Sequence, residues 1–140
     1  MITFPFGFFG GSAATPEAID LLLNNIPYAN GAWSVVRKLN KNYTGNLIEI
    51  RRSSDSAYQD IGFDANGDLD TAAITTFVGS NSAYVRTVYD QSGNGNNLYQ
   101  TTLGKQPRIV NAGTLDTING NPAYYHEAGD SLSTTSTIGT

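Results

Sequence analysis

Residues 87–100, TVYDQSGNGNNLYQ, decide how the chain is expected to fold. The segment from Ala83 to Tyr89 is rich in β-branched and aromatic residues, which is typical of a β-strand. Residues 98–102 are typical of a second strand. Between them lie Gly93 and Gly95, which adopt positive φ at little steric cost, and Asn, Ser and Asp side chains that can bond nearby backbone. The stretch therefore predicts two strands joined by a loop that its own polar groups order.

The loop supports two interpretations. In the first it is a binding site that presents polar side chains to a sugar or an ion, namely Asp90, Gln91, Asn94 and Asn96. In the second, Asp90 and Gln91 satisfy buried backbone groups and seat the loop on the sheet. No His, Cys or carboxylate cluster accompanies the loop, which favours the structural interpretation. Trp33, the single tryptophan, is either a sugar-stacking platform or, as we favour, a residue packed between helix and sheet.

Composition limits the classes of function. With 140 residues the chain is one domain or part of one, and only 14% of its residues are charged. The net charge of −4 and the lack of clustered Lys and Arg argue against nucleic-acid binding. The absence of cysteine excludes disulfides and thiolate metal sites. No apolar run reaches membrane-spanning length and the N-terminus is a poor secretion signal, so we expect no membrane insertion. No motif predicts a cofactor.

The N-terminus, residues 1–14, is predicted to be an aromatic anchoring arm. It holds four of the six phenylalanines, Phe4, Phe6, Phe8 and Phe9, without helical or strand periodicity. Exposed aromatic side chains are a liability unless they dock on something. The arm is therefore expected either to pack on this domain's own core or to anchor the protein on a partner chain, as termini need a tie to be ordered.

Residues 15–41 are expected to form a helical segment. Thr15-Pro16-Glu17 has the features of a helix start: a hydroxyl N-cap, a proline at the first helical position and an acid in the first turn. Apolar residues then recur at helical spacing up to Ile26, and Pro27 ends the helix. The same spacing predicts a second short helix over residues 32–39, at Ala32, Val35, Val36 and Leu39.

Residues 42–140 are expected to be a β-rich module with one helix. Strands are predicted at residues 47–52, 58–63, 83–89, 98–102, 108–111, 114–118, 123–126 and 131–133. The helix is predicted over residues 71–78. Asn119-Gly120 between β-prone segments indicates a hairpin turn. His126 has no second histidine to join it and is expected to face solvent.

One acidic loop resembles a calcium-binding loop only in part. Oxygen ligands alternate at Asp64, Asn66, Asp68 and Asp70. The sixth position is Leu69 where an EF-hand has Gly, and the twelfth is Thr75 where it has a bidentate Glu. Asp70 or Asp68 is better explained as the N-cap of the following helix. These four residues are therefore only a weak metal candidate.

From Trp33 to about Leu132 the sequence resembles the N-terminal part of the arabinofuranosidase B type catalytic domain, a concanavalin A-like β-sandwich. It resembles still more closely the non-enzymatic relatives of that domain in bacteriophage structural and tail-associated proteins. The motifs that carry the resemblance are Ala32-Trp33-Ser34, Arg37-Lys38-Leu39, Tyr43-Thr44-Gly45, residues 50–55 (IRRSSD), Asp60-Ile61-Gly62-Phe63, residues 89–95 (YDQSGNG) and residues 106–110 (QPRIV). The resemblance implies a mainly β protein with short N-terminal helices, namely the N-terminal part of a concanavalin A-like jelly-roll sandwich. It also implies that the catalytic carboxylates of the family correspond to positions after Thr140, so no catalytic residue is assigned to this chain.

The expected function is that of a bacteriophage virion structural protein, a capsid- or tail-associated lectin-like module for decoration or attachment. Its expected partners are other virion proteins, further copies of itself and a cell-surface glycan, and its expected location is the virion, after synthesis in the host cytoplasm. An arabinofuranosidase-like glycoside hydrolase and a carbohydrate-binding module are the alternatives. Hydrolysis needs two positioned carboxylates, and no motif pairs the acids of this sequence, so we expect a protein that is not an enzyme.

Overall fold

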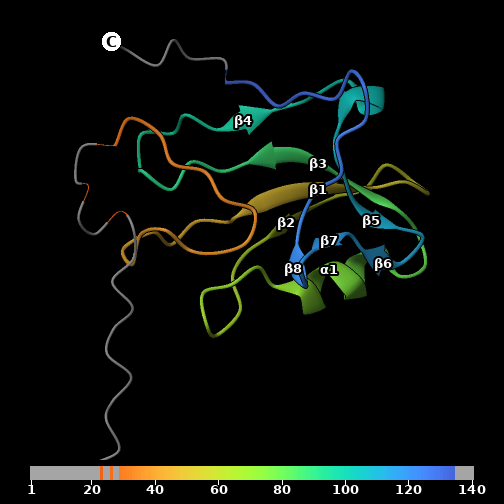
Figure 1. Ribbon diagram of the computed structural model, residues 1–140, viewed down its shortest axis with the longest axis horizontal. Coiled ribbons are helices and arrows are strands. Elements are labelled where there is room, and N and C mark those ends of the chain that lie inside the picture. The colour runs from red at the N-terminus through yellow and green to blue at the C-terminus, as the bar shows by residue number, and fades with distance from the viewer. Residues whose placement is uncertain (1–22, 24–25, 27–28, 135–140) are drawn as a thin grey trace, which may run out of the picture.

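A computed structural model describes residue 23, residue 26 and residues 29–134 of the chain. The predicted arm and nearly all of the first predicted helix lie outside the described residues. Within them the protein is mainly antiparallel β with one short α-helix (Figure 1). Its strands are β1 (Ile48–Arg52), β2 (Tyr58–Ile61), β3 (Ala83–Val88), β4 (Leu98–Tyr99), β5 (Arg108–Asn111), β6 (Thr114–Leu115), β7 (Thr117–Ile118) and β8 (Asn121–Pro122).

The main sheet is built around β3. Its strand order is β2-β1-β3-β5-β6, and β4 also pairs with β3. β1 runs along one edge of β3, from Ala83 to Val88. On the other edge, β5 pairs with Ala83 and Tyr84 while β4 pairs with Thr87 and Val88. The 3-10 helix η2 (Leu103–Lys105) and the buried Gln106-Pro107 pair lie in the connection between β4 and β5.

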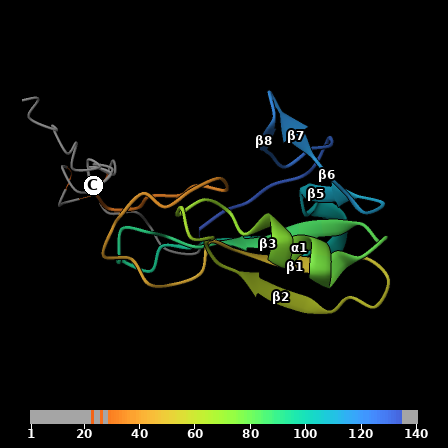
Figure 2. The ribbon, with the colours of Figure 1, turned by 90° about the horizontal axis from the view of Figure 1, so that it is seen from below.

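One face of the sheet is apolar and carries the core. Ile48 and Ile50 of β1 and the buried apolar residues of β3 and β5 point into it. The helix α1 (Thr71–Val78), drawn against the sheet in Figure 2, adds Ile74 and Val78 one turn apart. The core comprises Leu47, Ile48, Ile50, Ile61, Leu69, Ile74, Val78, Ala83, Val85, Val88, Ile109 and Val110. The predicted N-cap of this helix is confirmed, because the Asp70 side chain accepts the N–H of Ala73 at 2.9 Å.

The structure confirms the mainly β character of the expected fold, and the jelly-roll sandwich stays a prediction. The described residues form one six-stranded sheet and a separate two-stranded hairpin, β7–β8, rather than two facing sheets. The segment predicted as one strand from Thr114 to Ile118 is broken at Asp116 into β6 and β7. The predicted turn at Asn119-Gly120 is confirmed, with both residues at positive φ. Residues 123–126 contribute a single bridge, from Tyr125 to Arg108, where a strand was predicted.

The predicted helix over residues 32–39 is wrong. This segment has no helical turn in the structure. The N–H groups of Ala32 and Leu39 donate to the side chains of Asp90 and Gln91, and those of Val36 and Arg37 donate to Oγ of Ser34. Hydrogen bonds to side chains therefore satisfy the backbone that a helix would otherwise satisfy internally. The apolar spacing in this segment reflects burial of an irregular chain.

Gly113 lies in the β5–β6 turn, at a position where we predict that any other residue type destabilises the protein. Its φ is +82°, and a Cβ there would lie 2.9 Å from the carbonyl oxygen of Gly79. Gly113→Ala is expected to lower the free energy of unfolding by roughly 1 to 3 kcal/mol through backbone strain and this contact. Urea denaturation measures the change. Gly104→Ala is the control, because Gly104 has open space around it; equal stability of the two variants would contradict the prediction.

Candidate functional site

The Asp90 carboxylate closes the loop that follows β3. Its Oδ1 accepts the backbone N–H groups of Ala32 and Ser92, both at 2.8 Å. Its Oδ2 accepts the Ser92 hydroxyl at 2.7 Å and the N–H of Asn96 at 3.0 Å. The residue is only 3% exposed. One side chain thus joins both ends of its own loop to a segment 58 residues earlier in the chain.

Two opposing effects set the acidity of Asp90. Burial favours the neutral acid and so acts to raise the pKa. The hydrogen bonds from the Ser92, Ala32 and Asn96 backbone and from the Ser92 hydroxyl favour the charged form. Their combined effect is larger, and the pKa of Asp90 lies below its ordinary value. The carboxylate is therefore ionised at neutral pH and acts as a hydrogen-bond acceptor.

The Gln91 side chain bonds both an N–H and a carbonyl of the irregular segment over residues 32–39, as the backbone of a neighbouring strand would. Its Oε1 accepts the N–H of Leu39 at 2.7 Å, and its Nε2 donates to the carbonyl of Arg37 at 3.1 Å. Its backbone N–H donates to the carbonyl of Ala32 at 2.8 Å. The Gln91 side chain is itself fully buried, and burial strengthens its hydrogen bonds.

Asn94, Asn96 and Trp33 complete the same corner. The Asn94 amide donates to the carbonyl of Ala29 at 2.8 Å, and the Asn96 amide to that of Asn30 at 2.6 Å. The Trp33 indole N–H donates to the carbonyl of Asn96 at 2.8 Å. The Trp33 ring is half-buried against the core. The structure thus brings together the four loop residues and Trp33 that were selected from the sequence, and it gives each an internal structural partner. Their role in ligand binding stays a prediction.

The weak metal candidates have structural roles. Oδ1 of Asp64 accepts the N–H groups of Asn66 and Asp68, which lowers the Asp64 pKa. Asp68 forms an exposed ion pair with Arg37 at 3.7 Å, and Asp70 caps α1. Among the described residues no group of three or more His, Cys, Asp or Glu side chains could hold a metal ion.

A polar surface on the sheet was not predicted from the sequence. It depends on a β-bulge in the pairing of β3 with β1. Glu49 pairs with Thr87 and Ile50 with Val85, so Arg86 is the extra residue. The bulge brings two consecutive side chains to the same carboxylate. Arg86 Nη1 lies 2.8 Å from Oε2 of Glu49, and the Thr87 hydroxyl donates to the same oxygen at 3.0 Å.

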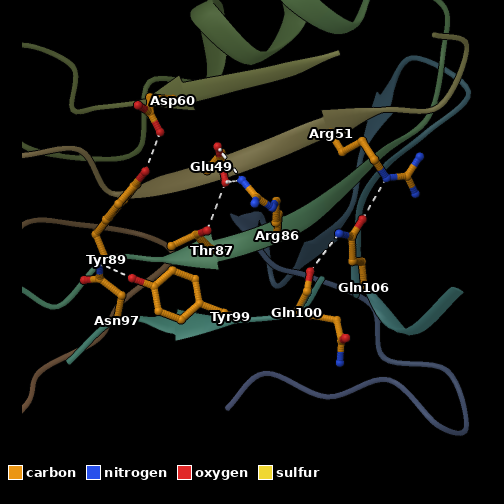
Figure 3. Close-up of polar contacts among 10 residues, drawn as sticks. All are labelled: Glu49, Arg51, Asp60, Arg86, Thr87, Tyr89, Asn97, Tyr99, Gln100 and Gln106. Atoms are coloured by element: carbon orange, nitrogen blue, oxygen red, sulfur yellow. Dashed lines mark hydrogen bonds and ion pairs between the residues drawn. The ribbon is translucent and has the colours of Figure 1, made fainter. Parts of the chain in front are cut away.

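The contacts continue across neighbouring strands on this face (Figure 3). Asp60 of β2 lies beside Glu49 in the register and accepts the Tyr89 hydroxyl at 2.6 Å. Burial, followed by this hydrogen bond and the Asp60 charge, raises the Tyr89 pKa. The Arg86 guanidinium lies 4.8 Å from the centre of the Tyr58 ring, a cation–π distance.

The same face ends at a buried arginine. Arg51 Nε donates to Oε1 of Gln106 at 2.8 Å, and Nε2 of Gln106 donates to the carbonyl of Gln100 at 2.8 Å (Figure 3). The Arg51 guanidinium stacks 4.8 Å from the centre of the Tyr84 ring. Alternation along β1 predicts that Glu49 and Arg51 share a face. Nothing in the sequence pattern predicts that Gln106 from a distant connection would hold the arginine.

The hydrogen bonds of these carboxylates indicate a structural role rather than acid–base catalysis. Arg86, Thr87 and Tyr89 bind the Glu49 and Asp60 carboxylates, and the Asp116 carboxylate holds the Arg108 guanidinium at 2.9 Å. The described carboxyl groups with shifted pKa values, Asp55, Asp64 and Asp90, are all shifted downward. A general acid for glycoside cleavage needs a raised pKa. These three groups are therefore unsuited to that role.

Comparison with known proteins identifies the family of this segment. A model of the family described as "Alpha-L-arabinofuranosidase B, catalytic" matches residues 23–125, which include β1 to β8 and α1. The chain belongs to this family. The alpha-L-arabinofuranosidase B of Aspergillus oryzae is 34% identical over 103 residues, and that of Penicillium canescens is 33% identical over 113 residues. These matches cover 66% and 69% of this chain but 20% and 24% of the relatives, so the chain spans about a fifth of their length.

Solved structures agree with this assignment. A GH54 a-l-arabinofuranosidase soaked with a cyclic sulfate inhibitor is 30% identical, with a TM-score of 0.52. The match covers 58% of this chain and 19% of that one. A mutant of a GH54 a-l-arabinofuranosidase soaked with 4-nitrophenyl a-l-arabinofuranoside gives the same TM-score over 57% of this chain. The predicted resemblance to the arabinofuranosidase B catalytic domain is therefore confirmed.

The comparisons give no support to the predicted role in a bacteriophage. The relatives reported above are arabinofuranosidases, so they favour the carbohydrate-active alternative over the virion protein. The virion location and the virion and glycan partners stay predictions. Among the described residues no helix has the length and apolar character needed to cross a membrane.

Asp90→Asn should destabilise the protein. An amide can offer only one acceptor oxygen, so its NH₂ group would face N–H or O–H donors that now bind the carboxylate. The expected loss in the free energy of unfolding is roughly 1 to 3 kcal/mol, measured by urea denaturation at pH 7. Asp68→Asn, at an exposed ion pair, is the control and should change little. Equal stability of Asp90→Asn and wild type would contradict the structural role.

The contribution of Asp90 to stability should depend on pH. Its pKa is lower in the folded than in the unfolded protein, so the unfolded state takes up a proton first as the pH falls. The stabilisation is complete above the unfolded pKa of about 4 and is lost as the pH falls through the lower folded value. The stability difference between wild type and Asp90→Asn is therefore expected to be largest near neutral pH and to shrink on acidification. A constant difference from pH 7 to pH 2.5 would contradict this.

Proposed function

We propose that this chain supplies the framework sheet of an arabinofuranosidase B type catalytic domain, within an assembly that acts on arabinofuranose-containing glycans. The observation that carries the proposal is the family match over residues 23–125. That range coincides with the sheet, its helix and the corner at Asp90. The matched segment therefore contains the framework of the sheet.

The state of the acidic side chains supports a framework role. Cleavage of a glycoside requires an acid and a second carboxylate about 5 to 10 Å apart on the two sides of the scissile bond. In this chain Glu49, Asp60 and Asp90 are committed to hydrogen bonds with neighbouring side chains and backbone. In this proposal residues outside the matched segment contribute the reacting carboxylates, and the sheet holds the surface on which they act.

A segment exchange tests the proposal. In the Aspergillus oryzae enzyme, residues 23–125 of this chain would replace the segment that they match, and release of 4-nitrophenol from 4-nitrophenyl α-L-arabinofuranoside would be measured. The exchanged enzyme is expected to fold and retain turnover, because the framework is shared. The 140-residue chain alone is expected to give no turnover.

A matched variant makes the exchange informative. Asp90→Asn in the exchanged enzyme should lower its melting temperature while leaving the pH profile of turnover unchanged, because Asp90 supports the fold and does not react. A folded but inactive exchanged enzyme would contradict the framework role. Turnover by the 140-residue chain alone, abolished by a single carboxylate substitution, would show that the chain contains its own reacting groups.

A further inference from the structure

A pocket opens on the polar face of the sheet at Arg51. It has a volume of about 410 Å³, within the usual range for small-molecule sites. Arg51, Tyr84 and Arg108 line it from the sheet, Gln106 lines it from the β4–β5 connection, and Glu127 and Asp130 come from the chain after β8. None of the residues placed at the Asp90 corner lines this pocket.

Arg51 is the unusual member of this set. It is 7% exposed, and a buried charge ordinarily has an opposite charge beside it. Among the described residues its guanidinium forms no ion pair with a carboxylate; the recorded ion pairs belong to Arg37, Arg52, Arg86 and Arg108. Its hydrogen bond to the neutral Gln106 uses Nε alone. Figure 3 shows its terminal nitrogens turned away from Gln106.

The surroundings fix this guanidinium in place. Gln106 is 2% exposed and is itself held by its bond to the Gln100 carbonyl. The Tyr84 ring supports one face of the guanidinium. An arginine whose rotamer is fixed before binding loses little side-chain entropy, and its planar fork matches a carboxylate in two hydrogen bonds. The site is thus prepared for a carboxylate.

The Glu127 and Asp130 side of the pocket determines which kind of molecule can bring that carboxylate to Arg51. Arg108 is neutralised by Asp116. Asp130 accepts the backbone N–H of Glu127 at 2.7 Å, and the Glu127 carboxylate forms no ion pair among the described residues. Carboxylates accept hydrogen bonds from hydroxyl groups and repel anions. A ligand with one negative charge and several hydroxyls fits both walls, whereas a doubly charged phosphate fits only Arg51.

We propose that this pocket binds a sugar acid, with the ligand carboxylate on Arg51 and its hydroxyls on the Glu127 and Asp130 side. The site is separate from any glycosidic chemistry and does not rest on the proposed function. If the chain binds sugar acids here but the exchanged enzyme is inactive, only the framework proposal is contradicted. If the exchanged enzyme is active but the chain binds no sugar acid, only the pocket proposal is contradicted.

Titration of the full 140-residue chain with sodium D-glucuronate at low ionic strength tests the proposal. Binding is followed by isothermal calorimetry and by the NMR signal of the Arg51 Nε–H group. Sodium acetate and methyl glucoside are the matched ligands that carry the carboxylate alone and the hydroxyls alone. Glucuronate is expected to bind at least tenfold more tightly than either and to shift the Arg51 signal. Equal affinity for acetate, or for methyl glucoside, would overturn the sugar-acid assignment.

Two variants locate the site. Arg51→Gln removes the charge and is expected to weaken glucuronate binding at least tenfold, whereas Arg37→Gln, at an exposed arginine outside the pocket, should leave it unchanged. Gly104→Phe is the second probe in case Arg51→Gln does not fold. Gly104 lines the pocket and has open space around it, so the added ring should block the pocket without disturbing the sheet. Undiminished glucuronate binding by folded Gly104→Phe would overturn the proposal.

Discussion

The carboxylate of Asp90 is the constraint on which the rest of this structure depends. Its two oxygens accept four hydrogen bonds, and the donors come from both ends of one loop and from a distant segment. The backbone of Ala32 could not be buried against the loop without such an acceptor, since an unpaired buried N–H group is costly. Asp90 therefore determines where the irregular segment over residues 29–40 lies. Gln91 then binds the far end of that segment at Leu39 and Arg37.

The bulge at Arg86 has a comparable effect on the sheet. A regular β3 would send Arg86 and Thr87 to opposite faces, one into the core and one outward. The extra residue allows both to meet Glu49 while Val85 and Val88 remain in the core. The apolar face and the polar face thus coexist on one short strand. Both candidate sites, the corner at Asp90 and the pocket at Arg51, lie at the ends of this polar face.

The features that could be predicted from the sequence are those that depend on residues close together in the chain. The β-branched residues of β3, the alternation in β1 and the Asp70 cap of α1 are local signals, and the structure confirms each. The helix predicted over residues 32–39 failed because side chains about 50 to 60 residues away take its backbone donors. For the same reason Asp90 and Gln91 could be selected from the sequence while their partners could not. The bulge carries no recognisable residue signal, so the meeting of Glu49 with both Arg86 and Thr87 was missed.

The distance along the chain between Asp90 and Ala32 also affects the order of folding. Synthesis proceeds from the N-terminus, so Ala32, Leu39 and Asn30 leave the ribosome 52 to 66 residues before the side chains of Asp90, Gln91 and Asn96 that bond to their backbone. Closing a loop of that length costs chain entropy before any contact repays it. These contacts therefore become available only after β3 and its loop have emerged, whereas the backbone bonds of Val36 and Lys38 with Leu69 and Gly67 become available earlier in synthesis.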